Sequence, residues 1–69
     1  MNKDLFTTRE LQVLKLLCKG YTNPQIAQCL FVSTHTAKAH VNAILHKLNV
    51  KNRTQAAFIS GYKGLINNI

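Results

Sequence analysis

The sequence predicts an all-α fold, a four-helix domain with a central helix-turn-helix, and two observations carry this prediction. Apolar residues recur at intervals of three and four, which is the period of a helix. Residues that cap helices precede each of these stretches, and no segment has the alternating pattern of a strand. We expect helices at about 8–19, 23–30, 34–48 and 53–63. A chain of 69 residues has room for one small domain, residues 1–69.

The first two helices each begin with a capping box. Thr7 and Glu10 form the first box, and Gly20 stands where this helix should end. Thr22 and Gln25 form the second box, in a first turn that tolerates a proline. The second helix is short, and a tight turn of about three residues separates it from the third, as in a helix-turn-helix.

The third helix begins at the N-cap Ser33 and has two contrasting faces. One face is an apolar stripe suited to a core, made of Ala37, Val41, Ile44 and Leu48. The opposite face carries His35, Lys38, Ala39 and Asn42. A lysine can donate to guanine, an asparagine can pair with an adenine edge, and a small residue allows close approach. We therefore predict that this face enters the major groove of DNA and that these four residues contact bases, with a phosphate as the other possible target of Lys38. The alternative is that Lys38 and His35 are merely solvated and that Asn42 is a neutral surface residue.

The fourth helix begins after the cap Asn52 and has more apolar surface than one side of so small a domain can bury. Gly64 is its expected stop, and Leu65 and Ile66 are expected to fold back beyond it. The excess apolar surface implies a protein partner. The predicted interface consists of small or apolar residues, Ala56, Ala57, Ile59 and Ser60.

The charge of the chain favours a polyanionic partner. Nine Lys and Arg residues against two acids give +7 at pH 7, and such a field attracts nucleic acid or an anionic membrane. No apolar run is long enough to span a membrane and no signal-peptide pattern opens the chain, so we expect no membrane partner. The predicted phosphate contacts are polar residues at helix starts and flanks, namely Thr22, Ser33, Thr34, Thr36, Lys47 and Arg53.

Several of these phosphate contacts have an alternative role. Thr22 and Ser33 can act as caps alone, although a capping hydroxyl can also contact phosphate. Lys47 can be merely solvated. Arg53 can form a structural ion pair with Glu10, one of the two acids in the chain.

The sequence predicts neither an enzyme nor a metal site. The one Asp and the one Glu lie in the first ten residues, so no nucleophile, base and orienting group can be assembled. Histidines at positions 35, 40 and 46 lack a zinc-ligand spacing. Cys18 and Cys29 lie in apolar helical patterns and are predicted to be buried, reduced thiols, as expected in the cytoplasm. We expect no cofactor and no small-molecule ligand in this domain.

Several segments together resemble the LuxR-type (GerE-like) helix-turn-helix domain of bacterial transcription regulators. They are residues 5–14 (LFTTRELQVL), 20–27 (GYTNPQIA), 32–40 (VSTHTAKAH), Ile44, 47–50 (KLNV), 53–57 (RTQAA) and 64–66 (GLI). The resemblance implies a domain core of about 5–66, a third helix in the major groove and a dimer formed through the fourth helix on a two-fold related site. It also makes RNA polymerase a candidate partner. The chain departs from the usual Val, basic residue and helix former of the family at Ala37, Asn42 and Gly61.

The predicted function is sequence-specific binding of double-stranded DNA by a transcription regulator that acts as a homodimer. Two alternatives stay open at this point. One is a protein-interaction module whose fourth helix makes the contacts, and the other is a promoter-recognition segment of a sigma factor, which uses a similar helix-turn-helix. Residues 7–13 and 53–57 favour the regulator.

Overall fold

The computed structural model describes residues 6–62 of the chain, and the side chains of residues 6–60. The described residues form four helices, α1 (Thr8–Cys18), α2 (Asn23–Leu30), α3 (Thr34–Leu48) and α4 (Arg53–Tyr62). This confirms the all-α prediction, and the bounds of the first three helices and the start of the fourth agree with it to within one residue. The expected stop at Gly64 and the return of Leu65 and Ile66 lie outside the described residues.

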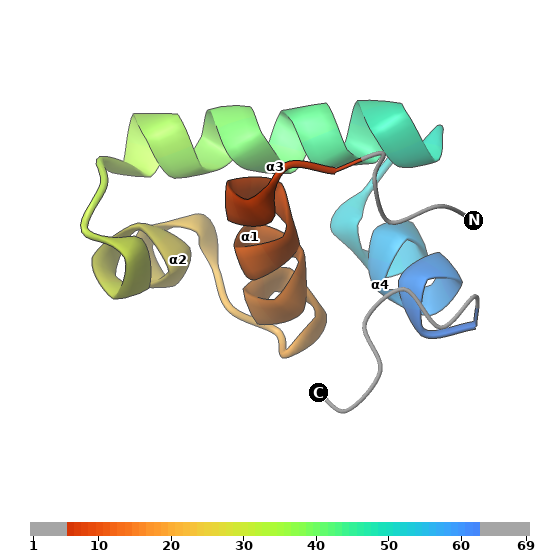
Figure 1. Cartoon of the computed structure of the whole chain (residues 1–69). Coiled ribbons are helices and arrows are strands. Elements are labelled where there is room, and N and C mark those ends of the chain that lie inside the picture. Colours follow the sequence, from red (N-terminus) through yellow and green to blue (C-terminus); the bar gives the residue numbers. More distant parts are fainter. Residues whose placement is uncertain (1–5, 63–69) are drawn as a thin grey trace.

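One long helix dominates the arrangement. α3 extends along one side of the molecule, and α1, α2 and α4 all lie on the same side of it (Figure 1). In this view α1 lies between α2 and α4, and no described helix lies above α3. One long face of α3 is therefore left uncovered by the rest of the described fold.

The core forms where the apolar sides of the helices meet. Val13 and Leu14 of α1, Ile26 of α2 and Ile44 of α3 have no exposed surface. All four members of the predicted stripe on α3 are buried, namely Ala37, Val41, Ile44 and Leu48. Full burial of an aliphatic side chain of this size stabilises a fold by about 1.5–3 kcal/mol. The buried stripe thus fixes how α3 is rotated about its axis.

Hydrogen bonds from nearby side chains set the start of each of the first three helices. Thr7 caps α1 and Thr22 caps α2, each in a complete capping box. Ser33 caps α3 by accepting from the amide of Thr36 at 3.0 Å. These caps were all predicted, because a cap joins residues only three positions apart.

Each of the first three helices is followed, within two residues of its end, by a residue with positive φ. Gly20 has φ 92°, Phe31 φ 58° and Asn49 φ 57°. The amide that follows each of these residues donates to a carbonyl five positions earlier: Tyr21 N to Leu16 O, Val32 N to Ala27 O and Val50 N to Leu45 O. Glycine and asparagine are common in this conformation, whereas phenylalanine is not. Phe31 was not predicted to adopt it.

The prediction that both cysteines are buried is wrong for Cys29. Cys29 is exposed and Cys18 is half-buried, and both are free thiols. The buried residues of α2 are Ile26 and Ala27, and Cys29 falls outside the face that they define. Burial raises the pKa of the Cys18 thiol to about 11, so this group stays protonated at neutral pH.

Candidate nucleic-acid interface

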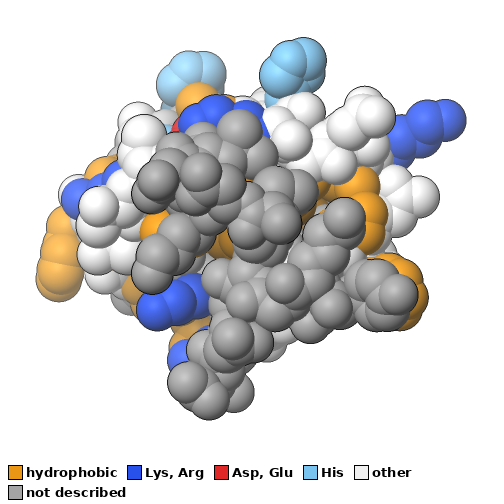
Figure 2. All heavy atoms as spheres, turned by 45° about the vertical axis from the view of Figure 1, so that its right-hand side comes forward, with side chains coloured by type: hydrophobic (Ala, Val, Ile, Leu, Met, Phe, Trp, Pro, Cys, Tyr) orange, Lys and Arg blue, Asp and Glu red, His pale blue; other side chains and the backbone are white. Residues whose placement is uncertain are grey.

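The uncovered face of α3 presents the four residues that were predicted to contact bases. His35, Lys38, Ala39 and Asn42 are all exposed. They share one face because they are separated by steps of three, one and three residues. This stretch is about 10 Å long at 1.5 Å per residue, and a major groove is about 12 Å wide. Figure 2 shows two histidine side chains that protrude at the upper edge of the molecule, where α3 runs in Figure 1.

Two of these side chains keep their recognition groups available. Within the described part of the chain, Lys38 has no ion-pair partner and the Asn42 amide has no hydrogen-bond partner. The ammonium group of Lys38 can therefore donate to a base or phosphate. The amide of Asn42 can offer a donor and an acceptor to one base edge.

The capping hydroxyls differ in what they can still donate. Thr22 Oγ1 accepts from Gln25 N at 3.3 Å, and its hydroxyl proton has no acceptor among the described residues. Ser33 Oγ accepts from Thr36 N and donates to Thr36 Oγ1, both at 3.0 Å. The hydroxyl proton of Ser33 is therefore used within the cap, and Thr36 is left as the outward donor. Thr34 is exposed beside them.

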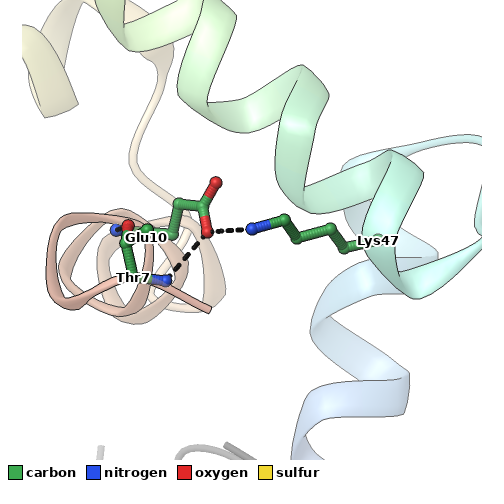
Figure 3. Close-up of polar contacts among 3 residues, drawn as sticks. All are labelled: Thr7, Glu10 and Lys47. Atoms are coloured by element: carbon green, nitrogen blue, oxygen red, sulfur yellow. Dashed lines mark hydrogen bonds and ion pairs between the residues drawn. The ribbon is translucent and has the colours of Figure 1, made fainter. Parts of the chain in front are cut away.

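Lys47 has a structural partner. Its Nζ donates to Glu10 Oε1 at 2.6 Å, and the same oxygen accepts from the Thr7 amide at 3.0 Å (Figure 3). The side chains of Lys47 and Glu10 are 31% and 10% exposed. The hydrogen bond from Lys47 is the main cause that holds the pKa of Glu10 below its ordinary value of 4.5. Lys47 Nζ also lies 5.9 Å from the ring centroid of Phe6.

Arg53 joins the start of α4 to the start of α2. Its Nη1 donates to the carbonyl oxygen of Tyr21 at 2.8 Å, and its Nη2 donates to Asn23 Oδ1. The alternative in which Arg53 pairs with Glu10 is wrong, because Lys47 holds that carboxylate. Both acceptors of the guanidinium are neutral, so Arg53 keeps its positive charge uncompensated within the described residues.

The predicted interface residues on α4 divide into two groups. Ala56 and Ser60 have no exposed surface and belong to the interior of the chain. Ala57 and Ile59 are partly exposed, and Phe58 between them is 73% exposed. Phe58 forms part of the wall of a shallow groove. The residues that line the groove are Asn49, Val50, Thr54, Gln55, Phe58 and Ile59.

On the face drawn in Figure 2, the charged side chains that can be seen are spread rather than clustered. In Figure 2, lysine and arginine side chains lie at several places on the visible face.

No group of three or more His, Cys, Asp or Glu side chains among the described residues could hold a metal ion. Within the same residues, no helix has both the length and the apolar character needed to cross a membrane.

Comparison with known proteins identifies the family. The sequence matches the family described as bacterial regulatory proteins, luxR family, over residues 4–60. The chain belongs to this luxR family. Its members are DNA-binding regulators of transcription.

Curated relatives of this luxR-family chain include the response regulator protein VraR of Staphylococcus aureus and the proteins of the same name from Staphylococcus saprophyticus and Staphylococcus epidermidis. Each is 41% identical to the chain over 63 residues, which make up 91% of this chain and 30% of the relative. The chain thus spans 30% of the length of the relatives it matches.

Three features of the candidate interface in this luxR-family domain were missed from the sequence. The pairs Lys47–Glu10 and Arg53–Asn23 join residues 37 and 30 positions apart, and no local pattern indicates such partners. A weak signal did exist for the first pair, because an acid in a chain with nine basic residues and two acidic ones is expected to find a basic partner, although the sequence does not say which one. The exposure of Phe58 depends on which side of α4 faces α1, and the consecutive residues Ala56, Ala57, Phe58 and Ile59 cover every side of the helix, so their spacing does not reveal it.

Proposed function

We propose that the chain binds double-stranded DNA in a sequence-specific manner, with α3 in the major groove. The observation that supports this most directly is the contrast between the two faces of α3. One face is buried in the core, and the opposite face presents exposed His35, Lys38, Ala39 and Asn42. In this proposal Lys38 donates to a guanine or a phosphate and Asn42 reads a base edge. Ala39 packs near a thymine methyl, and His35 contacts DNA from the first turn.

Contacts to the DNA backbone supply most of the affinity in this proposal. Thr22, Thr34 and Thr36 donate to phosphates from the starts of α2 and α3, while Ser33 keeps the cap of α3 in place. Arg53 adds a positive charge beside the start of α2. Lys47 is already paired with Glu10, so we assign it to holding α3 on α1 rather than to phosphate binding.

The proposal includes a homodimer formed through α4 on two half-sites related by a two-fold axis. The exposed ring of Phe58 and the adjacent groove support this, since exposed apolar surface of this kind is typical of protein contacts. Ala57 and Ile59 would extend the contact, and the buried Ala56 and Ser60 would support it from within. The dimer would act in the bacterial cytoplasm, with RNA polymerase as a candidate partner.

Selection of bound sites from a pool of random duplexes tests the whole proposal. We expect enrichment of one short motif, repeated in inverted orientation at a spacing of about one helical turn. Binding without any enriched motif would contradict sequence-specific readout. A single unrepeated motif would contradict the dimer on paired half-sites and leave the role of α3 intact.

A gel shift at two salt concentrations tests the class of protein. Affinity for duplex DNA should fall steeply as salt rises, because each neutralised phosphate releases a counterion. A chain that fails to bind bulk duplex at low salt would be a protein-interaction module instead, as the second hypothesis predicts.

A further inference from the structure

Arg53 brackets the residue that caps α2. Its two bonds go to the carbonyl of Tyr21 and to the side chain of Asn23, which are the residues immediately before and after Thr22. α1 lies between α2 and α4 in Figure 1, so the arginine side chain connects two helices that another helix separates in this view. The guanidinium therefore fixes the first turn of α2 relative to the first turn of α4.

The peptide between Tyr21 and Thr22 is held at both ends. Its carbonyl oxygen accepts from Arg53 at 2.8 Å, and its N–H group donates to Gln25 Oε1 at 2.8 Å. Thr22 Oγ1 also accepts from the amide of Gln25. The backbone amide of Thr22 already donates to Gln25, and its Oγ1 already accepts from Gln25. The hydroxyl proton of Thr22 is therefore the group that can still donate to an external acceptor.

We infer that Arg53 is a positioning residue for DNA binding, which acts by holding Thr22 and the start of α2 in the orientation that receives a phosphate. This inference rests on the proposed function and adds to it how one backbone contact is built. The role requires the planar fork of a guanidinium, because two acceptors on either side of Thr22 must be reached at once. A lysine keeps the charge but offers one compact donor group.

Two single variants separate positioning from charge. Asn23→Ala removes one acceptor of Arg53 without changing the charge of the chain, and Arg53→Lys keeps the charge without the fork. The probe is a duplex of about 30 base pairs, long enough for two half-sites one turn apart. Gln28→Ala, at an exposed position of α2, is the matched control. Thermal melts establish that each protein is folded at the assay temperature.

We expect each of the two variants to bind the duplex about threefold to tenfold more weakly than the unaltered chain, as for loss of one hydrogen bond. The double variant should bind the duplex with the same affinity as the single variant that binds it less tightly, because both changes remove the same link. The slope of affinity against salt should stay unchanged, since no charge is lost. Gln28→Ala should bind like the unaltered chain.

Several results would overturn the inference. If Arg53→Lys binds the duplex normally, Arg53 acts only through its positive charge on a phosphate. If Asn23→Ala binds normally, the hydrogen bonds of Arg53 on either side of Thr22 have no role in DNA binding. Asn23→Ala decides the question alone if Arg53→Lys is unfolded. Loss of stability with normal affinity would make Arg53 merely structural. If the unaltered chain does not bind the duplex, the proposed function falls and this inference falls with it.

Discussion

Lys38 and Lys47 lie nine residues apart on the same helix, yet only Lys47 has its charge neutralised. The difference follows from the two faces of α3. Lys47 lies near the C-terminal end of α3 and its side chain reaches Glu10 of α1, whereas Lys38 lies on the uncovered face. Two lysines of one helix therefore differ physically: Lys47 stabilises the fold, whereas Lys38 is left available for the recognition role that we propose.

Replacement of Lys38 tests its role in recognition. Lys38→Ala should weaken binding to the selected site by about 1–3 kcal/mol and relax the preference at one base pair. The matched control is Lys15→Ala, which removes the same charge from an exposed position on α1. Titrations of both variants against the selected duplex give the comparison. If the two variants bind the duplex with equal affinity, Lys38 does not contact a base.

The two thiols should differ sharply in reactivity. Cys29 is exposed, whereas burial raises the pKa of Cys18 to about 11. Because the thiolate is the reactive form, an alkylating reagent at pH 7 should modify Cys29 much faster than the half-buried Cys18. Mass spectrometry of proteolytic peptides measures both rates. Similar rates in the folded chain would contradict the burial of Cys18.

At the scale of the helices, local interactions were predictable and distant ones were not. The caps Thr7, Thr22 and Ser33 and the left-handed Asn49 follow from residues within a few positions of each helix end. The partners of Lys47 and Arg53 depend on how helices pack, which the spacing of apolar residues does not specify. In the same way, the sequence indicated the exposed polar face of α3 but not which capping hydroxyl, that of Thr22 or that of Ser33, keeps its proton available.

The ion pair between Glu10 of α1 and Lys47 of α3 should make the stability of the fold depend on pH. Glu10 has a lowered pKa in the folded chain, so its contribution is complete above its ordinary value of 4.5 and is lost as the pH falls through the lower folded-state pKa. Glu10→Gln should lower the free energy of unfolding at pH 7 by about 1 kcal/mol. The free energy of unfolding of this variant should also decrease less between pH 7 and acid pH than that of the unaltered chain. Glutamine still completes the capping box, so the variant isolates the pair.

Urea unfolding at pH 7 and in acid measures the effect, with Lys47→Met as the complementary variant. Lys47→Met should show a similar loss of stability and an unchanged salt slope of duplex binding. A slope smaller by about one unit would instead assign Lys47 to a phosphate.

The turn between α2 and α3 contains conformational strain at Phe31. This residue is 94% exposed and has φ 58°, a conformation that costs most residues about 1–2 kcal/mol. Phe31→Asn should raise the free energy of unfolding by about 1 kcal/mol, because asparagine tolerates this conformation and little packing is lost. Phe31→Ala is the control, because alanine lacks the short polar side chain with which asparagine forms local hydrogen bonds in this conformation. Urea unfolding should rank the asparagine variant above the alanine variant, and the reverse order would contradict the strain.

At the scale of the whole molecule, α4 should govern how two copies bind together. Phe58→Asp places a charge on the exposed ring position beside the groove and should abolish cooperative binding to paired half-sites. Gln12→Asp, on the exposed side of α1, changes the charge equally and should leave cooperativity intact. Titrations with duplexes that carry one or two half-sites measure both quantities. Cooperative binding by Phe58→Asp would place the dimer contact elsewhere.

The opposed faces of α3 also bear on how such a protein can diverge. His35, Ala39 and Asn42 contribute nothing to the interior, so substitutions there should leave folding almost untouched. Under the proposed function, duplicated copies of the gene can therefore acquire new operators by changing a few codons. The opposite stripe would be inherited almost unaltered, since each of its four members fills space in the interior.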